Sequence, residues 1–202
     1  MDAAGSLAAN YATAIRLIDE AHAKDPNTIS GDDGPIPYEL HYARKMTRWL
    51  ASRKPDASPA LQLACRAQHF RRYPMTRAGY LTWRARQKAQ AAEQVAELLS
   101  SSPAIQPSLA QDEVERVAAL VRKENLKADE ETQVLEDVAC LVFLDDQFDD
   151  FEKKSEMDEE KMINILRKTW AKMSDDGRKL ALGMQLSERA ATLIQKALAG
   201  EN

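Results

Sequence analysis

An almost unbroken run of apolar positions lies between Thr132 and Leu144, in the stretch TQVLEDVACLVFL. From Val134 onward every residue of this run is apolar or small except Glu136 and Asp137. Apolar side chains on all faces indicate a helix that is buried on every side, and the run is too short to cross a bilayer. We therefore expect this helix at the centre of the fold, with Asp137 pointing inward from it.

Other apolar positions recur at helical spacing, and no stretch alternates in the manner of a strand. The segment 28–37 is a polar loop rich in Gly, Asp and Pro. The predicted fold class is therefore all-α: a single-domain bundle of about eight helices over residues 1–202, with frayed ends at 1–5 and 200–202. Flexible loops are expected near 27–37 and 100–109. The other helices are expected over 6–23, 38–53, 59–70 or beyond, 76–100, around 114–121, from about 158 to 173, and after 174–176 as far as 198.

Composition narrows the function classes. The net charge of −4 over 202 residues gives no global basic field, so binding to nucleic acid through charge alone is not expected. The two cysteines, Cys65 and Cys140, fall in predicted core helices and indicate a reducing compartment. No secretory signal or membrane-spanning run is present, so we expect a cytoplasmic protein with no membrane partner. The phosphate-binding loop, GxGxxG, GxSxG and HExxH motifs are missing.

Three polar residues on separate predicted helices are candidate metal ligands: His41, His69 and Asp137. Imidazole and carboxylate groups suit zinc, iron or manganese, so a single divalent metal is the expected cofactor if one is bound. We take His69, Asp137 and Glu136 as catalytic candidates. The alternative is that His69 is a hydrogen-bonded core histidine and that Asp137 caps a helix or pairs with an arginine. His22, at a helix end, is expected to be a solvated residue of the last turn.

A second cluster combines arginines with aromatic rings in one helix–break–helix unit. Such a combination can hold a phosphate, a nucleotide or single-stranded nucleic acid. The alternative is a solvated face in which one or two arginines pair with the acidic residues at 145–152. The candidate ligand-binding residues are Arg71, Arg72, Arg84, Tyr80, Trp83 and Gln68, and the expected partner is a small anionic or phosphorylated ligand.

Four segments, LACRAQHFRR, YPMTRAGYLTWR, TQVLEDVACLVFL and INILRKTWAKMS, resemble the family called domain of unknown function 4202. This family is found in fungi and bacteria, and the resemblance is to the fungal type over nearly the whole chain. Fungal members sometimes carry the label glutamyl-tRNA synthetase. Nothing here resembles a synthetase nucleotide-binding motif, so synthetase activity is not expected.

The family in turn resembles HD-domain proteins, which are helical metal-dependent phosphohydrolases. By this resemblance His41 matches the first histidine of the HD pattern, His69 the histidine of the His-Asp pair, and Asp137 the last aspartate. Gln68 stands beside His69, and the carboxylate of the pair is missing, so the resemblance implies one metal ion with an open position. The loop after QHFRR also lacks the short W-x-x-P-R-like insert of the family.

Three functions follow as hypotheses. The first is an HD-like phosphohydrolase, in which a metal-bound water attacks a small phosphorylated or nucleotide substrate while arginines hold the phosphate charge. The second is a metal-free module that binds an anion or nucleotide within an HD-type shell. The third is an RNA-associated protein that uses the arginines and aromatic rings.

Overall fold

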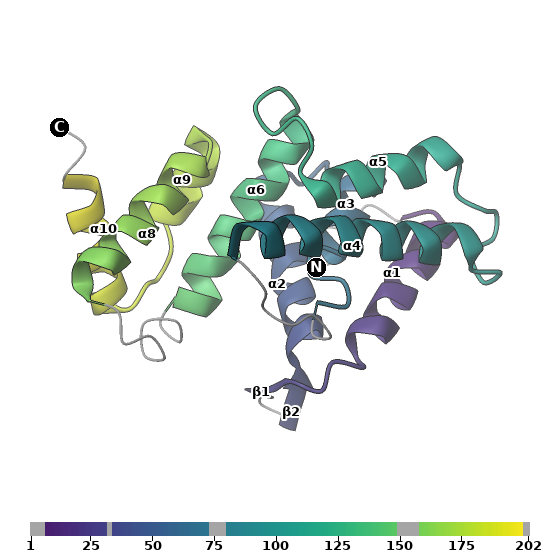
Figure 1. Ribbon diagram of the computed structural model, residues 1–202, viewed down its shortest axis with the longest axis horizontal. Coiled ribbons are helices and arrows are strands. Elements are labelled where there is room, and N and C mark those ends of the chain that lie inside the picture. The colour runs from purple at the N-terminus through teal and green to yellow at the C-terminus, as the bar shows by residue number, and fades with distance from the viewer. Residues whose placement is uncertain (1–6, 32–33, 73–79, 149–157, 200–202) are drawn as a thin grey trace. The chain divides into compact units, whose positions relative to one another are not determined.

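The computed structural model describes residues 7–31, 34–72, 80–148 and 158–199. The chain forms two compact units, Met1–Leu135 and Glu136–Asn202. Within the described residues there are nine α-helices, one π-helical turn and a single two-stranded sheet, which confirms the all-α prediction (Figure 1). None of the described helices combines the length and the apolar character that a bilayer crossing requires.

The helices of the first unit pack against one another in several pairs. Helix α5 packs against both α3 and α4, and α1 packs against α2, α3 and α4. Figure 1 shows α4 and α5 running side by side. The core of the unit is aliphatic, and α3 contributes Leu61 and Leu63, both fully buried. Its elements are α1 (Ala9–His22), β1 (Thr28–Gly31), β2 (Gly34–Pro37), α2 (Tyr38–Arg53), α3 (Pro59–Arg66), α4 (Tyr80–Ser101), α5 (Gln111–Arg122) and the start of α6 (Glu130–Val142).

The segment predicted as a loop at 28–37 contains a small antiparallel hairpin. Strand β1 pairs with β2 so that Ile29 lies opposite Ile36 and Gly31 opposite Gly34. Gly34 has a φ of 122°, a conformation that side-chain-bearing residues rarely adopt. The sequence did not predict these strands, because β2 contains two prolines, which disfavour strands, and its apolar and polar residues do not alternate. The prediction that residues 28–37 form only a loop was therefore wrong at this hairpin.

Helix α3 begins as predicted and ends earlier than predicted. The hydroxyl of Ser58 accepts a hydrogen bond from the Leu61 amide, and Pro59 occupies the first helical position. The helix ends at Arg66, and residues 67–71 form consecutive turns instead of the further helical turn that we expected. These turns are stabilised from outside by α1 and α2, through contacts that no local sequence signal reveals.

The second unit contains the end of α6, a π-helical turn (Phe143–Gln147) and α8 (Glu159–Lys172), α9 (Asp175–Leu182) and α10 (Glu188–Ala199). Helices α8 and α10 pack against each other. The side chains of Asp158 and Ser174 cap α8 and α9 by accepting hydrogen bonds from backbone amides. The single helix predicted after Ser174 is two helices, because α9 ends at Leu182 and Gly183 follows it.

An ion pair at the start of α6 makes part of the stability depend on pH. The Arg116 guanidinium donates hydrogen bonds to both oxygens of Asp129, at 2.5 and 2.9 Å, and this holds the pKa of Asp129 at about 2. Since the folded-state pKa lies below the ordinary value of 3.8, the stabilisation is complete above the ordinary value and is lost as pH falls towards 2.

We therefore expect Asp129→Asn to be less stable than the parent at about pH 5, and the gap to narrow as pH falls to about 2. Urea unfolding followed by circular dichroism across this range measures the gap. A gap that stays constant or widens on acidification would show that Asp129 does not contribute in this way.

Candidate functional site

Asp137 caps a helix of the second unit. Its side chain is fully buried, and its two oxygens accept hydrogen bonds from the Ser174 amide (2.8 Å) and the Ser174 hydroxyl (2.5 Å). Ser174 is the N-cap of α9, so the carboxylate lies at the positive end of that helix. Gly177 lies so close that an added Cβ would be 2.7 Å from Cγ of Asp137. Glu136, the neighbouring catalytic candidate, pairs with Lys172 at 3.8 Å.

His69 belongs to the first unit and contacts Tyr42 and Arg72. Its ring stacks on the buried Tyr42 ring at a centroid distance of 3.6 Å and an angle of 9°. Its Nε2 lies 2.6 Å from Nη1 of Arg72. A guanidinium only donates hydrogen bonds, so Nε2 must be the acceptor and His69 is the neutral tautomer protonated at Nδ1. His41 lies on α2 and is half-buried.

His69 and Asp137 each have hydrogen-bond partners within their own unit. The guanidinium of Arg72 lies against Nε2 of His69, and both oxygens of Asp137 accept hydrogen bonds from Ser174. In the part of the chain that the structure describes, no group of three or more His, Cys, Asp or Glu side chains is placed to hold a metal ion. A bound divalent ion at His41, His69 and Asp137 stays a prediction.

The arginines of the second predicted cluster have different roles. Arg66 is nearly buried, and its Nε and Nη2 donate to the two oxygens of Asp19 at 2.6 and 2.7 Å. Its Nη1 also donates to the Thr47 hydroxyl at 2.9 Å. This bidentate pair ties the end of α3 to α1. Arg66 is therefore a structural residue.

Arg71 and Arg72 are half-buried and follow Arg66 in a stretch of turns. We call residues 66–72 the arginine turn. Arg71 has a φ of 49°, in the left-handed region that residues other than glycine seldom occupy. Its guanidinium lies 5.1 Å from the centroid of the buried Phe70 ring. Among the described residues, no carboxylate lies within ion-pair distance of Arg71. Backbone strain of this kind is concentrated at functional sites.

The prediction that His22 is solvated was wrong, and Glu39 was not among the predicted site residues. His22 is fully buried on α1 instead of solvated, and its Nδ1 lies 3.2 Å from Glu39 on α2. Glu39 is also buried, and its other carboxylate oxygen accepts a hydrogen bond from the Arg72 amide at 2.5 Å. A signal for His22 was present, because it lies one helical turn after Ile18 on the apolar face of α1.

Of the other predicted ligand-binding residues, the structure describes the side chain of Gln68 and leaves three undescribed. The side chains of Tyr80, Trp83 and Arg84 lie outside the described part of the chain, although their backbone forms the start of α4. Gln68 is buried within the arginine turn, and its Oε1 has no hydrogen-bond partner among the described residues. An unpaired buried acceptor is uncommon and disfavours the folded state unless a donor reaches it.

The fold and these contacts define an all-α protein with a polar, arginine-bearing turn beside a buried His–Glu pair. The chain belongs to the family described as domain of unknown function (DUF4202), whose sequence pattern matches residues 12–194. No curated protein and no solved structure matches the chain.

Proposed function

We propose that this protein binds a small phosphorylated ligand at the arginine turn, with Arg71 and Arg72 holding the phosphate charge. This is the second of the three functions considered from the sequence. The observation that carries it is Arg71, a half-buried guanidinium in a left-handed backbone conformation with no carboxylate partner among the described residues. A guanidinium fork matches the geometry of phosphate oxygens and keeps its charge at any physiological pH.

The surroundings of Arg71 support this proposal because they are already rigid. Phe70 is buried, packs edge-on against the His22 ring at 5.6 Å, and carries the Arg71 guanidinium over its own ring. Arg72 is oriented by His69, which in turn stacks on Tyr42. A site whose side chains are fixed before the ligand arrives loses less conformational entropy on binding.

The carboxylates near the arginine turn have partners other than Arg71. The carboxylate of Asp19 forms an ion pair with Arg66. The carboxylate of Asp25 accepts hydrogen bonds from the backbone amides of Asn27 and Glu39. Arg71 and Arg72 add two positive charges at the end of the turn, and the neutral His69 accepts from Arg72 and adds none. The support for an anionic ligand is therefore the guanidinium of Arg71, which has no carboxylate partner among the described residues.

Hydrolysis of the bound ester was the first function considered, and it requires an activated water. Nε2 of His69 and both oxygens of Asp137 take part in hydrogen bonds with Arg72 and Ser174. Binding alone is therefore the function that the contacts favour, and the residues that carry it are Arg71 and Arg72.

We expect pyrophosphate at about 100 times its Kd to raise the melting temperature of the parent protein by about 5–10 °C. Arg71→Ala should weaken pyrophosphate binding by at least about tenfold, because a hydrogen bond to a charged group contributes about 1.5–3 kcal/mol. Calorimetric titration at low salt measures the Kd of parent and variant. Alanine keeps the left-handed strain at residue 71, so the comparison isolates the guanidinium.

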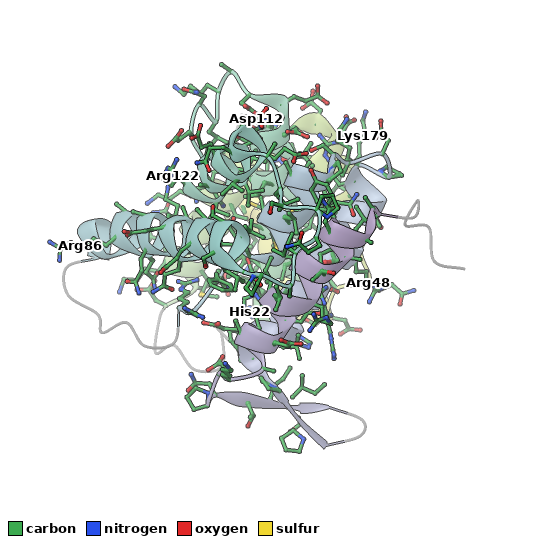
Figure 2. The ribbon with its side chains drawn as sticks, turned by 90° about the vertical axis from the view of Figure 1, so that its right-hand side faces the viewer. His22, Arg48, Arg86, Asp112, Arg122 and Lys179 are labelled. Carbon is green, nitrogen blue, oxygen red and sulfur yellow. The ribbon has the colours of Figure 1, made fainter. Side chains whose placement is uncertain are left out.

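Arg48→Ala is the matched control. Arg48 is an exposed arginine on α2 in the same unit, and Figure 2 shows its side chain pointing away from the helices. It should bind pyrophosphate as the parent does. Equal weakening in the two variants would mean that only overall charge matters. No binding of pyrophosphate by the parent, together with binding of a single-stranded oligoribonucleotide, would replace this proposal with the RNA hypothesis.

A further inference from the structure

A buried His–Glu pair lies beneath the arginine turn. His22 and Glu39 come from α1 and α2, and their side chains are 0% and 3% exposed. Nδ1 of His22 lies 3.2 Å from Oε2 of Glu39, and Nε2 lies 2.9 Å from the Arg66 carbonyl oxygen. The pair therefore touches the first residue of the arginine turn through His22.

The groups that face His22 and Glu39 determine which of their atoms carry hydrogen. A carbonyl oxygen only accepts, so Nε2 of His22 must carry a hydrogen. The other ring nitrogen faces a carboxylate oxygen, and one more proton must lie between Nδ1 and Oε2 for that contact to be a hydrogen bond. Glu39 keeps its second oxygen, Oε1, as a pure acceptor.

Oε1 of Glu39 is directed at the arginine turn. It accepts a hydrogen bond from the Arg72 amide at 2.5 Å, and the same amide also lies 3.2 Å from the carbonyl oxygen of His69. Glu39 thus contacts the backbone that joins the left-handed Arg71 to Arg72. The Glu39 amide is itself fixed, because it donates to Oδ2 of Asp25 at 3.0 Å.

We propose that Glu39 is a positioning residue for the phosphate site, holding the Arg72 backbone while His22 orients its carboxylate. This inference rests on the proposed function. A buried ionisable pair stabilises a fold less well than apolar side chains of similar volume, so packing alone gives no reason for it. Its contacts instead connect α1, α2 and both ends of the arginine turn. That arrangement sets the direction in which Arg71 and Arg72 point.

Glu39→Gln and Glu39→Met separate positioning from charge and from packing. The side-chain amide introduced by Glu39→Gln can accept from Arg72 with its oxygen and donate to Nδ1 of a neutral His22 with its nitrogen, so both of these hydrogen bonds are kept. The thioether introduced by Glu39→Met fills a similar volume but offers the Arg72 amide no comparable acceptor. We expect Glu39→Gln to bind pyrophosphate within about twofold of the parent and Glu39→Met to bind about tenfold more weakly.

Amide hydrogen exchange of Arg72, measured by nuclear magnetic resonance, supplies a readout that does not depend on any ligand. Exchange should be faster in Glu39→Met than in the parent and unchanged in Glu39→Gln. If the parent fails to bind pyrophosphate, the proposed function fails, and the exchange rates still decide whether Glu39 holds the turn. Should Glu39→Met not fold, Glu39→Asp keeps the buried charge but shortens the reach by one methylene, and the results expected for Glu39→Met then apply to it.

Two outcomes would overturn the inference. One is a folded Glu39→Met (or Glu39→Asp) variant with the parent's affinity for pyrophosphate and the parent's exchange rate at Arg72. The other is a Glu39→Gln variant that loses as much affinity as Glu39→Met, because the charge of Glu39 would then matter and its hydrogen-bonding geometry would not.

Discussion

Asp19→Ala is expected to lower the free energy of unfolding by about 3–5 kcal/mol, one of the largest effects of any single substitution in this chain. The Arg66 side chain is only 10% exposed, and its two hydrogen bonds to Asp19 would be lost while its charge stayed buried. The reverse change, Arg66→Met, should have a smaller effect, because the Asp19 side chain is 28% exposed and can be hydrated.

Urea unfolding of the three proteins measures this asymmetry. Glu20→Ala is the control on the same helix, because its ion pair with Arg16 is more than half exposed on both sides and should matter by less than about 1 kcal/mol. If Asp19→Ala and Glu20→Ala are equally mild, Arg66 does not depend on Asp19 and the arginine turn is not tied to α1 in the way described.

The second large effect concerns the cap of α9. Gly177→Ala should destabilise by about 1–3 kcal/mol, because its Cβ would lie 2.7 Å from Cγ and 2.8 Å from Oδ1 of the buried Asp137. Asp137→Ala should destabilise by about 3 kcal/mol, since the Ser174 amide and hydroxyl then lose their acceptor.

The double variant should be more stable than the sum of these losses predicts, by about 1–2 kcal/mol, because removal of the Asp137 carboxylate makes room for the new methyl group. A double-mutant cycle on urea-unfolding free energies measures this coupling. Strict additivity would indicate that Asp137 and Gly177 do not meet as the structure places them.

Much of the helical pattern was predictable because its signals are local. The predicted range 38–53 is the same as α2, which lies between Pro37 and the Lys54-Pro55 pair. Ser58 and Pro59 marked the start of α3, and Asp158 marked the start of α8. Each of these boundaries is decided by one or two neighbouring residues, so a single sequence was enough.

The arginine turn was not predictable at the same level, because its conformation depends on residues far away in the chain. Residues 67–71 carry neither glycine nor proline, and the apolar register continues through Phe70. The helix stops because Glu39 and His22, on other helices, bond to the backbone at the two ends of the turn. These hydrogen bonds join residues that are far apart in the sequence, so the pattern of residues 59–72 alone cannot predict them.

At Asp137, the burial of the side chain was predictable from the sequence, but its hydrogen-bond partner was not. Its burial followed from the surrounding apolar run, and helix capping was one of the alternatives considered. Its partner, Ser174, lies 37 residues further on and was noted only as a helix start. The burial of a position can be deduced from the apolar residues around it in the sequence. Its hydrogen-bond partner can be identified only in the folded chain.

If Arg71 and Arg72 hold a phosphorylated ligand, the bound ligand should protect both side chains from chemical modification. The protein is treated with phenylglyoxal with and without saturating pyrophosphate, and modified residues are quantified by mass spectrometry. Arg48 and Arg86 serve as internal references, because both are exposed and Figure 2 shows them pointing away from the body of the protein. We expect pyrophosphate to slow the modification of Arg71 and Arg72 and to leave the modification rates of Arg48 and Arg86 unchanged. Equal rates at Arg71 and Arg72 with and without pyrophosphate, or slowing at all four arginines alike, would contradict it.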